Sequence, residues 1–218
     1  MAELGARWGT WGARAAAALA TLNPMPYALH FVESDPRYCG ELADVMALNK
    51  LNYSLECVKA SSEGLAAWIR EQDHVDLLDM DVQGAEIDLL EDPTTFQAIN
   101  SKVYRVVIGT HSPEIHQEIA ARFQSWILIY DLPYAPNKQC LREHLRGARG
   151  DADQTGVDVG HFHRILELGC YNWSPWGRIP NWDGELIFDN PHYVTPQRHF
   201  TMSDRDLVAD ELDEPLDV

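Results

Sequence analysis

Short apolar runs alternate with helix-like patterns along the first 130 residues of the chain. The runs predicted to be strands cover Leu29–Val32, Ser54–Val58, Val75–Met80, Val103–Ile108 and Trp126–Tyr130. The run at Val103–Ile108 is rich in β-branched residues, which favour strands. Because strands that alternate with helices assemble into parallel sheets, the pattern predicts an α/β fold with helices packed on a mostly parallel sheet.

Helix signals lie between these runs. The first helix is predicted over about Thr10–Leu22, and shorter helices over Leu65–Ile69 and from Glu86 to Leu90. Two further helices have clear start signals, because Asp35 and Ser112 each directly precede a proline. An N-cap side chain followed by proline at the first helical position is a typical helix start.

The pattern weakens after residue 130. Residues 131–184 are rich in Pro, Gly, Asn and Asp, and we expect an elaborated loop or lid region there, with a short strand or helix at Ile165–Leu168. Leu186–Phe188 is predicted to be the last strand. This organisation predicts one domain over residues 1–200 and an acidic tail over residues 201–218.

The formal net charge of −17 narrows the possible partners. An acidic surface repels phosphate backbones, so a small-molecule substrate is favoured over nucleic acid. The stretch from Ser203 to Val218 has seven acids and one base, which is typical of a solvated or disordered tail, with docking on a basic partner as the alternative. No apolar run is long enough to span a membrane, and the oligomeric state is open.

Four cysteines, Cys39, Cys57, Cys140 and Cys170, show no Cys-x-x-Cys spacing. They are therefore expected to be free thiols in a reducing compartment. The early Ala-rich stretch Ala15–Leu22 lacks the features of a signal peptide. A cytoplasmic location is the expectation that follows.

The N-terminal segment carries the first candidate binding residues. Glu3, Gly5, Ala6 and Gly9 form an acidic, glycine-containing turn just before the first predicted helix. Glycines allow tight turns and close approach of the backbone to a ligand. An acidic side chain there can hold the cationic amino group of a ligand. The segment resembles the S-adenosylmethionine (SAM)-binding loop of Rossmann-like methyltransferases, and this resemblance makes the four residues candidates for binding that cofactor.

Glu33, followed by Ser34, ends the second predicted strand. In nucleotide-binding α/β folds an acid at this place accepts hydrogen bonds from ribose hydroxyls. A nicotinamide dinucleotide is the alternative ligand, but the spacing Gly5-x-x-x-Gly9-x-x-Gly12 departs from the Gly-x-Gly-x-x-Gly pattern that such ligands require.

The most specific motif is Asp79-Met80-Asp81-Val82-Gln83-Gly84-Ala85-Glu86. It lies at the predicted carboxyl end of a strand, where α/β sheets bind ligands. The stretch resembles the Asp-x-Gln-Gly-x-Glu motif of FkbM-type methyltransferases. Ile108–Ser112 with His116, Trp176-Gly177, and Asp183-Gly184 leading to Asn190-Pro191 are also similar to one branch of that family, so the resemblance spans roughly residues 3–193.

The resemblance implies a Rossmann-like class I methyltransferase fold and SAM-dependent methyl transfer to an oxygen, such as a hydroxyl, of a small metabolite or sugar. It places Asp81 near the methyl donor or acceptor, and Glu86 and Gln83 as substrate contacts or as structure at the helix start. Two alternatives stay open: a non-catalytic SAM-binding or interaction protein, and a nicotinamide-dependent oxidoreductase.

Histidines supply the candidate proton acceptor. His111 follows the Val103–Ile108 strand, and its ordinary pKa lies near neutrality, so it is the predicted general base, with ordering of the helix start as the alternative. His116 is expected to pack in the core. His161 and His163 lack a recognisable third ligand, so no metal site is predicted.

The loop region contains three tryptophans that are close in sequence. They either line a substrate pocket or pack the loops, and they are Trp173, Trp176 and Trp182.

Only Met1 and Ala2 precede Glu3, where the fold family has a central strand between the strands that end at Glu33 and Asp81. We therefore expect that first strand to be largely missing, from a fragment or an incomplete N-terminus, with unpaired backbone in the middle of the sheet.

Overall fold

The computed structural model describes residues 1–22, 24–132, 171–174, 177–180 and 184–193. Its strands are β1 (Ala2–Leu4), β2 (Leu29–Val32), β3 (Tyr53–Glu56), β4 (Val75–Met80), β5 (Val103–Thr110), β6 (Ile127–Leu132), β7 (Tyr171–Ser174), β8 (Gly177–Pro180) and β9 (Gly184–Asp189). Its helices are α1 (Thr10–Leu22), α2 (Pro36–Leu48), α3 (Ser62–Glu71), α4 (Glu86–Glu91), α5 (Pro93–Lys102) and α6 (Pro113–Arg122).

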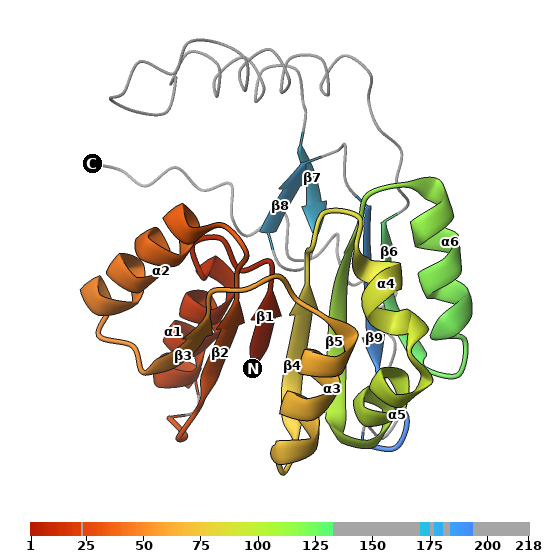
Figure 1. The fold of residues 1–218 in the computed structure, drawn as a ribbon, viewed down its shortest axis with the longest axis horizontal. Coiled ribbons are helices and arrows are strands. Elements are labelled where there is room, and N and C mark those ends of the chain that lie inside the picture. The colour runs from red at the N-terminus through yellow and green to blue at the C-terminus, as the bar shows by residue number, and fades with distance from the viewer. Residues whose placement is uncertain (23, 133–170, 175–176, 181–183, 194–218) are drawn as a thin grey trace, which may run out of the picture.

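Seven of these strands form one sheet in the order β3-β2-β1-β4-β5-β9-β6 (Figure 1). The pairs among β1 to β5 are parallel, and β9 runs antiparallel to both β5 and β6. This mostly parallel sheet with flanking helices confirms the Rossmann-like fold class predicted from the sequence.

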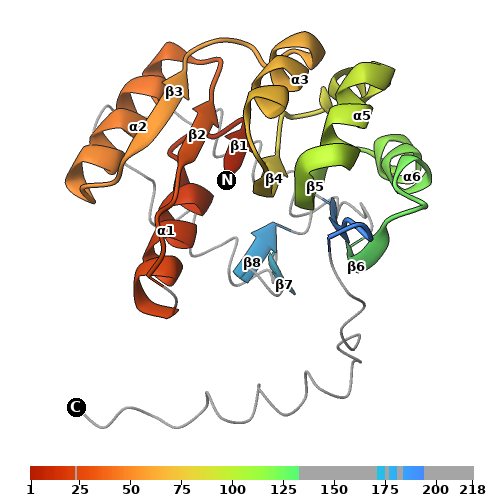
Figure 2. The same cartoon turned by 90° about the horizontal axis from the view of Figure 1, so that it is seen from below.

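The two faces of the sheet have separate apolar clusters. The larger one joins Leu4, Met80, Ile108 and Leu186 to helices α3 to α6. The smaller one joins Leu29 and Phe31 to α1 and α2. Figure 2 shows α1 and the β7–β8 ribbon on one side of the sheet and α3, α5 and α6 on the other. Because side chains alternate along a strand, Glu3 in β1 lies on the same face as its partner Phe31 in β2.

Strand β1 holds the position where the sequence predicted most of a strand to be missing. It is only three residues long, and it pairs with β2 on one side and with β4 on the other. Ala2 and Leu4 are buried. The short strand therefore closes the middle of the sheet along three residues and places Glu3 between β2 and β4.

The predicted helix starts are confirmed. Asp35 accepts a hydrogen bond from Arg37 N at 2.9 Å, and Ser112 accepts one from Ile115 N at 3.1 Å. Some other helices and strands were not predicted from the sequence. Helix α5 was not predicted, and β7 and β8 lie inside the region 131–184 that was predicted as loop. The predicted element at Ile165–Leu168 and the acidic tail lie outside the described residues.

The prediction of free thiols is wrong for two cysteines, because Cys39 and Cys57 form a disulfide. Cys39 lies in the first turn of α2, and Cys57 directly follows β3. The parallel register of β2 and β3, with Val32 opposite Glu56, brings both cysteines to the same edge, with their Cα atoms 6.0 Å apart. The argument for a reducing compartment therefore fails for this pair, while Cys140 and Cys170 lie outside the described residues.

We expect the disulfide to contribute to stability. It closes a loop with a sequence separation of 18, for which chain entropy gives about 3 kcal/mol. A Cys39→Ala/Cys57→Ala double variant is predicted to lose about that much free energy of unfolding, measured by denaturant titration. Alkylation of the denatured, unreduced protein followed by mass spectrometry provides the control, and alkylation of both thiols without reductant would contradict the link.

The close approach of the β1–α1 loop to β4 predicts a large cost for a side chain at Gly5. Its φ is +75°, and a Cβ there would lie 2.0 Å from the backbone oxygen of Asp81. Gly5→Ala is therefore expected to lower the free energy of unfolding by about 3 kcal/mol.

Two matched glycines separate the causes of that loss. Gly84→Ala meets the same kind of strain, at φ +101°, with no atom within 4 Å, so it measures the backbone cost alone. Gly40→Ala, on the exposed side of α2 with no atom within 4 Å, is expected to stabilise by about 0.5–1 kcal/mol. Equal melting curves for Gly5→Ala and Gly84→Ala would show that the contact with Asp81 does not matter.

Candidate active site

A cavity of about 590 Å³ opens at the carboxyl ends of β1, β2 and β4. The chain runs from β1 outward to β2 and β3 and then crosses back to β4 on the other side of β1. This reversal is the topological switch point at which open α/β sheets bind ligands. Of the predicted cofactor residues, those that line the cavity are Glu3, Gly5, Ala6, Glu33, Ser34 and Asp81.

The β1–α1 loop forms one wall of the cavity. Gly5 N and Ala6 N donate to Val32 O at 2.9 and 3.2 Å, and Arg7 N donates to Glu33 Oε2 at 2.8 Å. Gly9, the remaining residue predicted to bind cofactor, does not line the cavity. Its φ of +65° turns the chain into α1, so its role in this structure is in the shape of the loop.

Glu3 lies at the inner end of the cavity and is only 3% exposed. Its Oε2 accepts a hydrogen bond from Gly12 N, in the first turn of α1, at 2.8 Å. Burial raises the pKa of Glu3 to about 7, against the lowering effect of backbone hydrogen bonds from Gly12 and Trp11. A cationic ligand group placed beside Glu3 would favour its ionised form.

Glu33 lies at the end of β2 and orders the loops around it. Its Oε2 accepts from Arg7 N, and its Oε1 accepts from Asp35 N at 2.8 Å. A carboxylate has further lone pairs beyond these two bonds, so it can also accept hydrogen bonds from a ligand. Cys39 Sγ lies 3.6 Å from the backbone oxygen of Glu33, which places the disulfide directly behind this wall.

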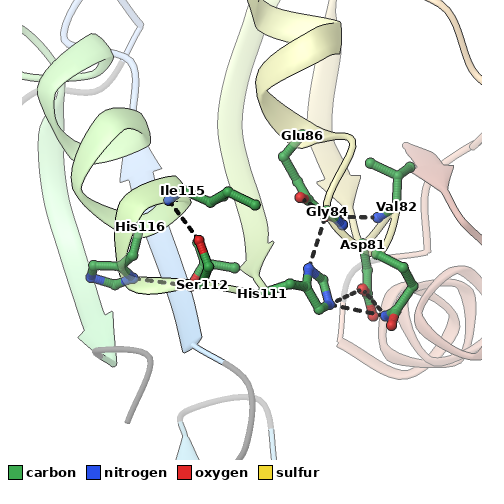
Figure 3. Close-up of polar contacts among 10 residues, drawn as sticks. Asp81, Val82, Gly84, Glu86, His111, Ser112, Ile115 and His116 are labelled. Carbon is green, nitrogen blue, oxygen red and sulfur yellow. Dashed lines mark hydrogen bonds and ion pairs between the residues drawn. The ribbon is translucent and has the colours of Figure 1, made fainter. Parts of the chain in front are cut away.

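Asp81 and His111 meet beyond the end of β4 (Figure 3), and the Gln83 side chain contacts both of them. His111 Nε2 lies 3.1 Å from Asp81 Oδ1, and Gln83 Nε2 lies 2.7 Å from the same oxygen. Gln83 has a φ of +55°, a left-handed conformation that is uncommon outside glycine. Asp81 is half-exposed and lines the cavity, whereas His111 is mostly buried behind it.

Glu86 holds the Asp81–Glu86 loop together. Its side chain is fully buried and accepts hydrogen bonds from Val82 N and Gly84 N. Its Oε1 also lies 3.0 Å from His111 Nδ1, as an ion pair rather than an aligned hydrogen bond. Glu86 does not line the cavity, so its position favours the structural alternative, in which it fixes the loop and orients His111.

The two carboxylates change the protonation of His111. Burial alone would lower its pKa, but the interactions with the Asp81 and Glu86 carboxylates outweigh burial and raise the pKa to about 10. His111 is therefore a cation at neutral pH in this arrangement. The sequence argument for a general base assumed an ordinary pKa, and the role stays a prediction that would require His111 to lose its proton.

Asp81, Glu86 and His111 also offer three potential metal-ligand atoms within 4.8 Å of one another. The two ring nitrogens of His111, however, each face a different carboxylate. The arrangement is that of a histidine held between two acids, and the second candidate pair, His161 and His163, lies outside the described residues.

His116 has the packing role that the sequence predicted. It is 9% exposed, and its ring nitrogens lie 3.0 Å from Thr110 Oγ1 and 3.1 Å from Asp131 Oδ1. These contacts join the start of α6 to the ends of β5 and β6, and they hold the turn from which His111 projects. Of the predicted pocket tryptophans, Trp176 and Trp182 lie outside the described residues, and the side chain of Trp173 is not described.

Two buried acids next to the site were not singled out as site residues from the sequence. Asp79, in β4, lines the cavity, and burial, together with Glu3, Asp81 and Glu185, raises its pKa well above the ordinary value. Glu185, in β9, is 8% exposed, and burial, with the charge of Asp81, raises its pKa to about 7. Asp79 could have been found from the sequence, because it is the first residue of the Asp79–Glu86 motif. Glu185 could not, because its place beside the site depends on which strand pairs with β5.

The only cations that line the cavity among the described residues are Arg7 and Lys59. The Arg7 guanidinium lies 4.2 Å from the centre of the Trp8 ring and 5.0 Å from that of Tyr38. The acids that line the cavity are Glu3, Glu33, Asp35, Asp79 and Asp81. The cavity therefore favours a cationic ligand over a phosphate-bearing one.

Comparisons with known proteins gave structural similarities only. No protein-family model matches the chain, and no curated protein sequence matches it. Among solved structures, TehB from Haemophilus influenzae has a TM-score of 0.47 and 11% identity, covering 87% of this chain and 56% of that one.

Two further solved structures are similar at the same level. The precorrin-6y C5,15-methyltransferase from Geobacter metallireducens has a TM-score of 0.44 and 16% identity, over 64% of this chain and 70% of that one. TrmK from M. capricolum, in complex with S-adenosyl-homocysteine, has a TM-score of 0.43 and 6% identity, over 90% and 64%. Because all three TM-scores lie below 0.5, none of these similarities assigns a function to this chain.

Among the described residues, no helix is both long and apolar enough to cross a membrane.

The ion pairs of His111 predict a pH-dependent contribution to stability. Its folded pKa of about 10 lies above its ordinary value of 6.5, so the stabilisation is full below pH 6.5 and is lost as the pH rises through about 10. The stability difference between the wild type and His111→Gln should shrink across this window. Nitrogen NMR of the imidazole should show a doubly protonated ring at pH 8.

Asp81→Asn is the matched variant, since it removes one carboxylate and leaves Glu86 in place. It should lower the pKa of His111 measured in the same titration. A His111 resonance that titrates near pH 6.5 in the wild type would show that the two ion pairs do not form in solution.

Proposed function

We propose that this chain is a SAM-dependent methyltransferase that acts on a small molecule. The observation that carries the proposal is the acidic cavity at the topological switch point, with Glu3 at its inner end and Glu33 at the end of β2. SAM has a sulfonium, an ammonium, a ribose and no phosphate. These groups match the carboxylates of the cavity better than a dinucleotide would.

The residues fit the cofactor group by group. Glu33 would accept hydrogen bonds from the ribose hydroxyls, with Ser34 beside it. Glu3 would hold the ammonium, and the backbone at Gly5 and Ala6 allows close approach, because Gly5 has no side chain. Asp81, on the far side of β1, would face the methyl group and the acceptor.

SAM supplies a methyl group that is already activated on sulfur, so the hard chemistry belongs to the cofactor. The chain must align the acceptor with the methyl group and hold or remove a proton. Asp81 is the candidate catalytic residue, because its carboxylate reaches the cavity. His111 and Glu86 are positioning residues in the arrangement seen here: the His111 cation pairs with Asp81, and Glu86 fixes His111.

The finer parts of the proposal rest on the sequence. The resemblance to FkbM-type methyltransferases favours a hydroxyl oxygen as the acceptor, and the negative net charge disfavours polyanionic substrates such as nucleic acid. A cytoplasmic location is proposed on the same basis, without the support of the cysteines. An oxidoreductase is tested by thermal shift, since stabilisation by NAD but not by SAM would overturn the methyltransferase proposal.

The pKa of Glu3 predicts how cofactor-product binding responds to pH. S-adenosylhomocysteine carries the ammonium that Glu3 would hold, and binding it requires Glu3 to lose its proton. Because that pKa is about 7, the affinity measured by calorimetry should rise about tenfold from pH 6 to pH 8, with proton release. Glu3→Gln should weaken binding and flatten this pH response.

Glu33→Gln is the control for that experiment. It should weaken binding through the ribose contact but keep the pH response, because the response originates at Glu3. Binding that is independent of pH in the wild type, or that survives Glu3→Gln unchanged, would place the ammonium elsewhere. Absence of any binding of SAM or S-adenosylhomocysteine would refute the proposed cofactor itself.

A further inference from the structure

Asp81 and Glu185 flank Gly109 on one face of the sheet. Glu185 in β9 is the register partner of Gly109 in β5, and Met80 in β4 is the partner of Ile108. Asp81 therefore follows β4 beside Gly109, and a Cβ on Gly109 would lie 3.3 Å from Asp81 Oδ1. With glycine in the middle, no side chain separates the two acids.

One carboxylate oxygen of Glu185 is buried without a hydrogen-bond partner. The residue is only 8% exposed, and the unpartnered atom is its Oε1. A buried carboxylate without a partner is costly, and such groups are normally paired or held for a ligand. The nearby charged groups that act on its ionisation are acidic, since Asp81 raises its pKa and Glu185 in turn raises that of Asp79.

This pair of acids begins at the proposed cofactor cavity. Asp81 lines that cavity from the β4 side, while Glu185, which does not line it, lies in β9, two strands further along the sheet and beyond Gly109 in β5. In the proposed binding mode the transferred methyl group faces Asp81, so the Asp81–Gly109–Glu185 row lies where the methyl acceptor must enter. Both carboxylates lie on the α1 face of the sheet, the same face as Glu3.

We propose that Asp81 and Glu185 form an ammonium-binding acceptor subsite, and that the methyl acceptor is an amine. This inference rests on the proposed SAM-dependent function and replaces the hydroxyl acceptor suggested by the sequence. A hydroxyl would give Glu185 one hydrogen bond but no charge, whereas an ammonium gives hydrogen bonds and a positive charge opposite Glu185, which among the described residues has no cationic partner of the kind that His111 provides for Asp81.

The chemistry balances without a further reactant. The ammonium loses one proton to the Glu185 carboxylate and becomes a neutral amine. The nitrogen lone pair then forms the new bond to the methyl carbon, while the bond between that carbon and sulfur breaks and its electron pair stays on sulfur. The products are a methylated ammonium, a neutral thioether and a protonated Glu185.

Sinefungin provides a defined test, because it carries an amino-bearing carbon where SAM has its methylsulfonium. S-adenosylhomocysteine has a neutral sulfur at that position and is otherwise matched. Calorimetry should show that the wild type binds sinefungin about tenfold more tightly than S-adenosylhomocysteine. Glu185→Gln should abolish this preference and change the affinity for S-adenosylhomocysteine by less than about twofold.

Two other variants and a stability measurement make the result specific. Gly109→Ala, which places a methyl group beside Asp81, should also reduce the preference. Glu91→Gln, which removes an exposed charge at the end of α4, should retain it. The melting temperature of Glu185→Gln should be unchanged or higher, because the substitution replaces a buried carboxylate, whose Oε1 has no hydrogen-bond partner, with a neutral amide.

Each outcome decides the inference. If Glu185→Gln keeps the preference for sinefungin over S-adenosylhomocysteine, or if the wild type has no such preference, the ammonium subsite is overturned. Binding of S-adenosylhomocysteine would still support the proposed cofactor. A parallel loss of both ligands in Glu185→Gln shows that Glu185 supports the cavity in general, which also overturns it. If the wild type binds neither ligand, the proposed function fails and the subsite falls with it.

Discussion

The burial of acidic side chains at one edge of the sheet is the constraint on which the site depends. Glu3, Asp79 and Glu185 are each less than 10% exposed, and their pKa values are all raised. Burying carboxylates close together costs free energy unless protons or cations neutralise them. The sheet tolerates the cost because its other face is packed against α3 to α6 in a continuous apolar cluster. These three buried acids therefore make the site electrostatically more favourable for a cation than for an anion.

The elements with local signals could be predicted from the sequence. Helix α1 and strands β2 and β4 have the predicted bounds, because each depends on periodicity within its own segment. The Asp35-Pro36 helix start was found, but the identical signal Asp92-Pro93, which begins α5, was not used. Its cap bond, from Thr94 N to Asp92 at 2.8 Å, is the same kind of bond that Asp35 accepts at the start of α2.

Only the part of the site that follows from the order of the parallel strands could be predicted from the sequence. Glu33 and Asp81 directly follow β2 and β4, and Glu3 lies in the short β1 between them, so a doubly wound order brings the three acids to one cavity. The position of Glu185 beside Gly109 depends on the antiparallel insertion of β9 between β5 and β6, which no local pattern encodes. The protonation state of His111 likewise depends on a contact that the sequence does not reveal, because the Glu86 side chain folds back over its own loop. The ordinary histidine pKa therefore predicted a neutral ring, whereas His111 is a cation in this arrangement. The disulfide was missed for a similar reason, since residues 18 apart in sequence meet only through the β2–β3 register.

The disulfide also ties the cavity to the redox state of the chain. Tyr38 and Val58, which line the cavity, are the immediate sequence neighbours of Cys39 and Cys57. Any ligand that binds the cross-linked cavity more tightly than the reduced one must, by thermodynamic reciprocity, make the disulfide harder to reduce by the same factor. A shift in the reduction potential of the Cys39–Cys57 disulfide therefore reports binding of such a ligand in the cavity. This measurement does not require the acceptor to be known.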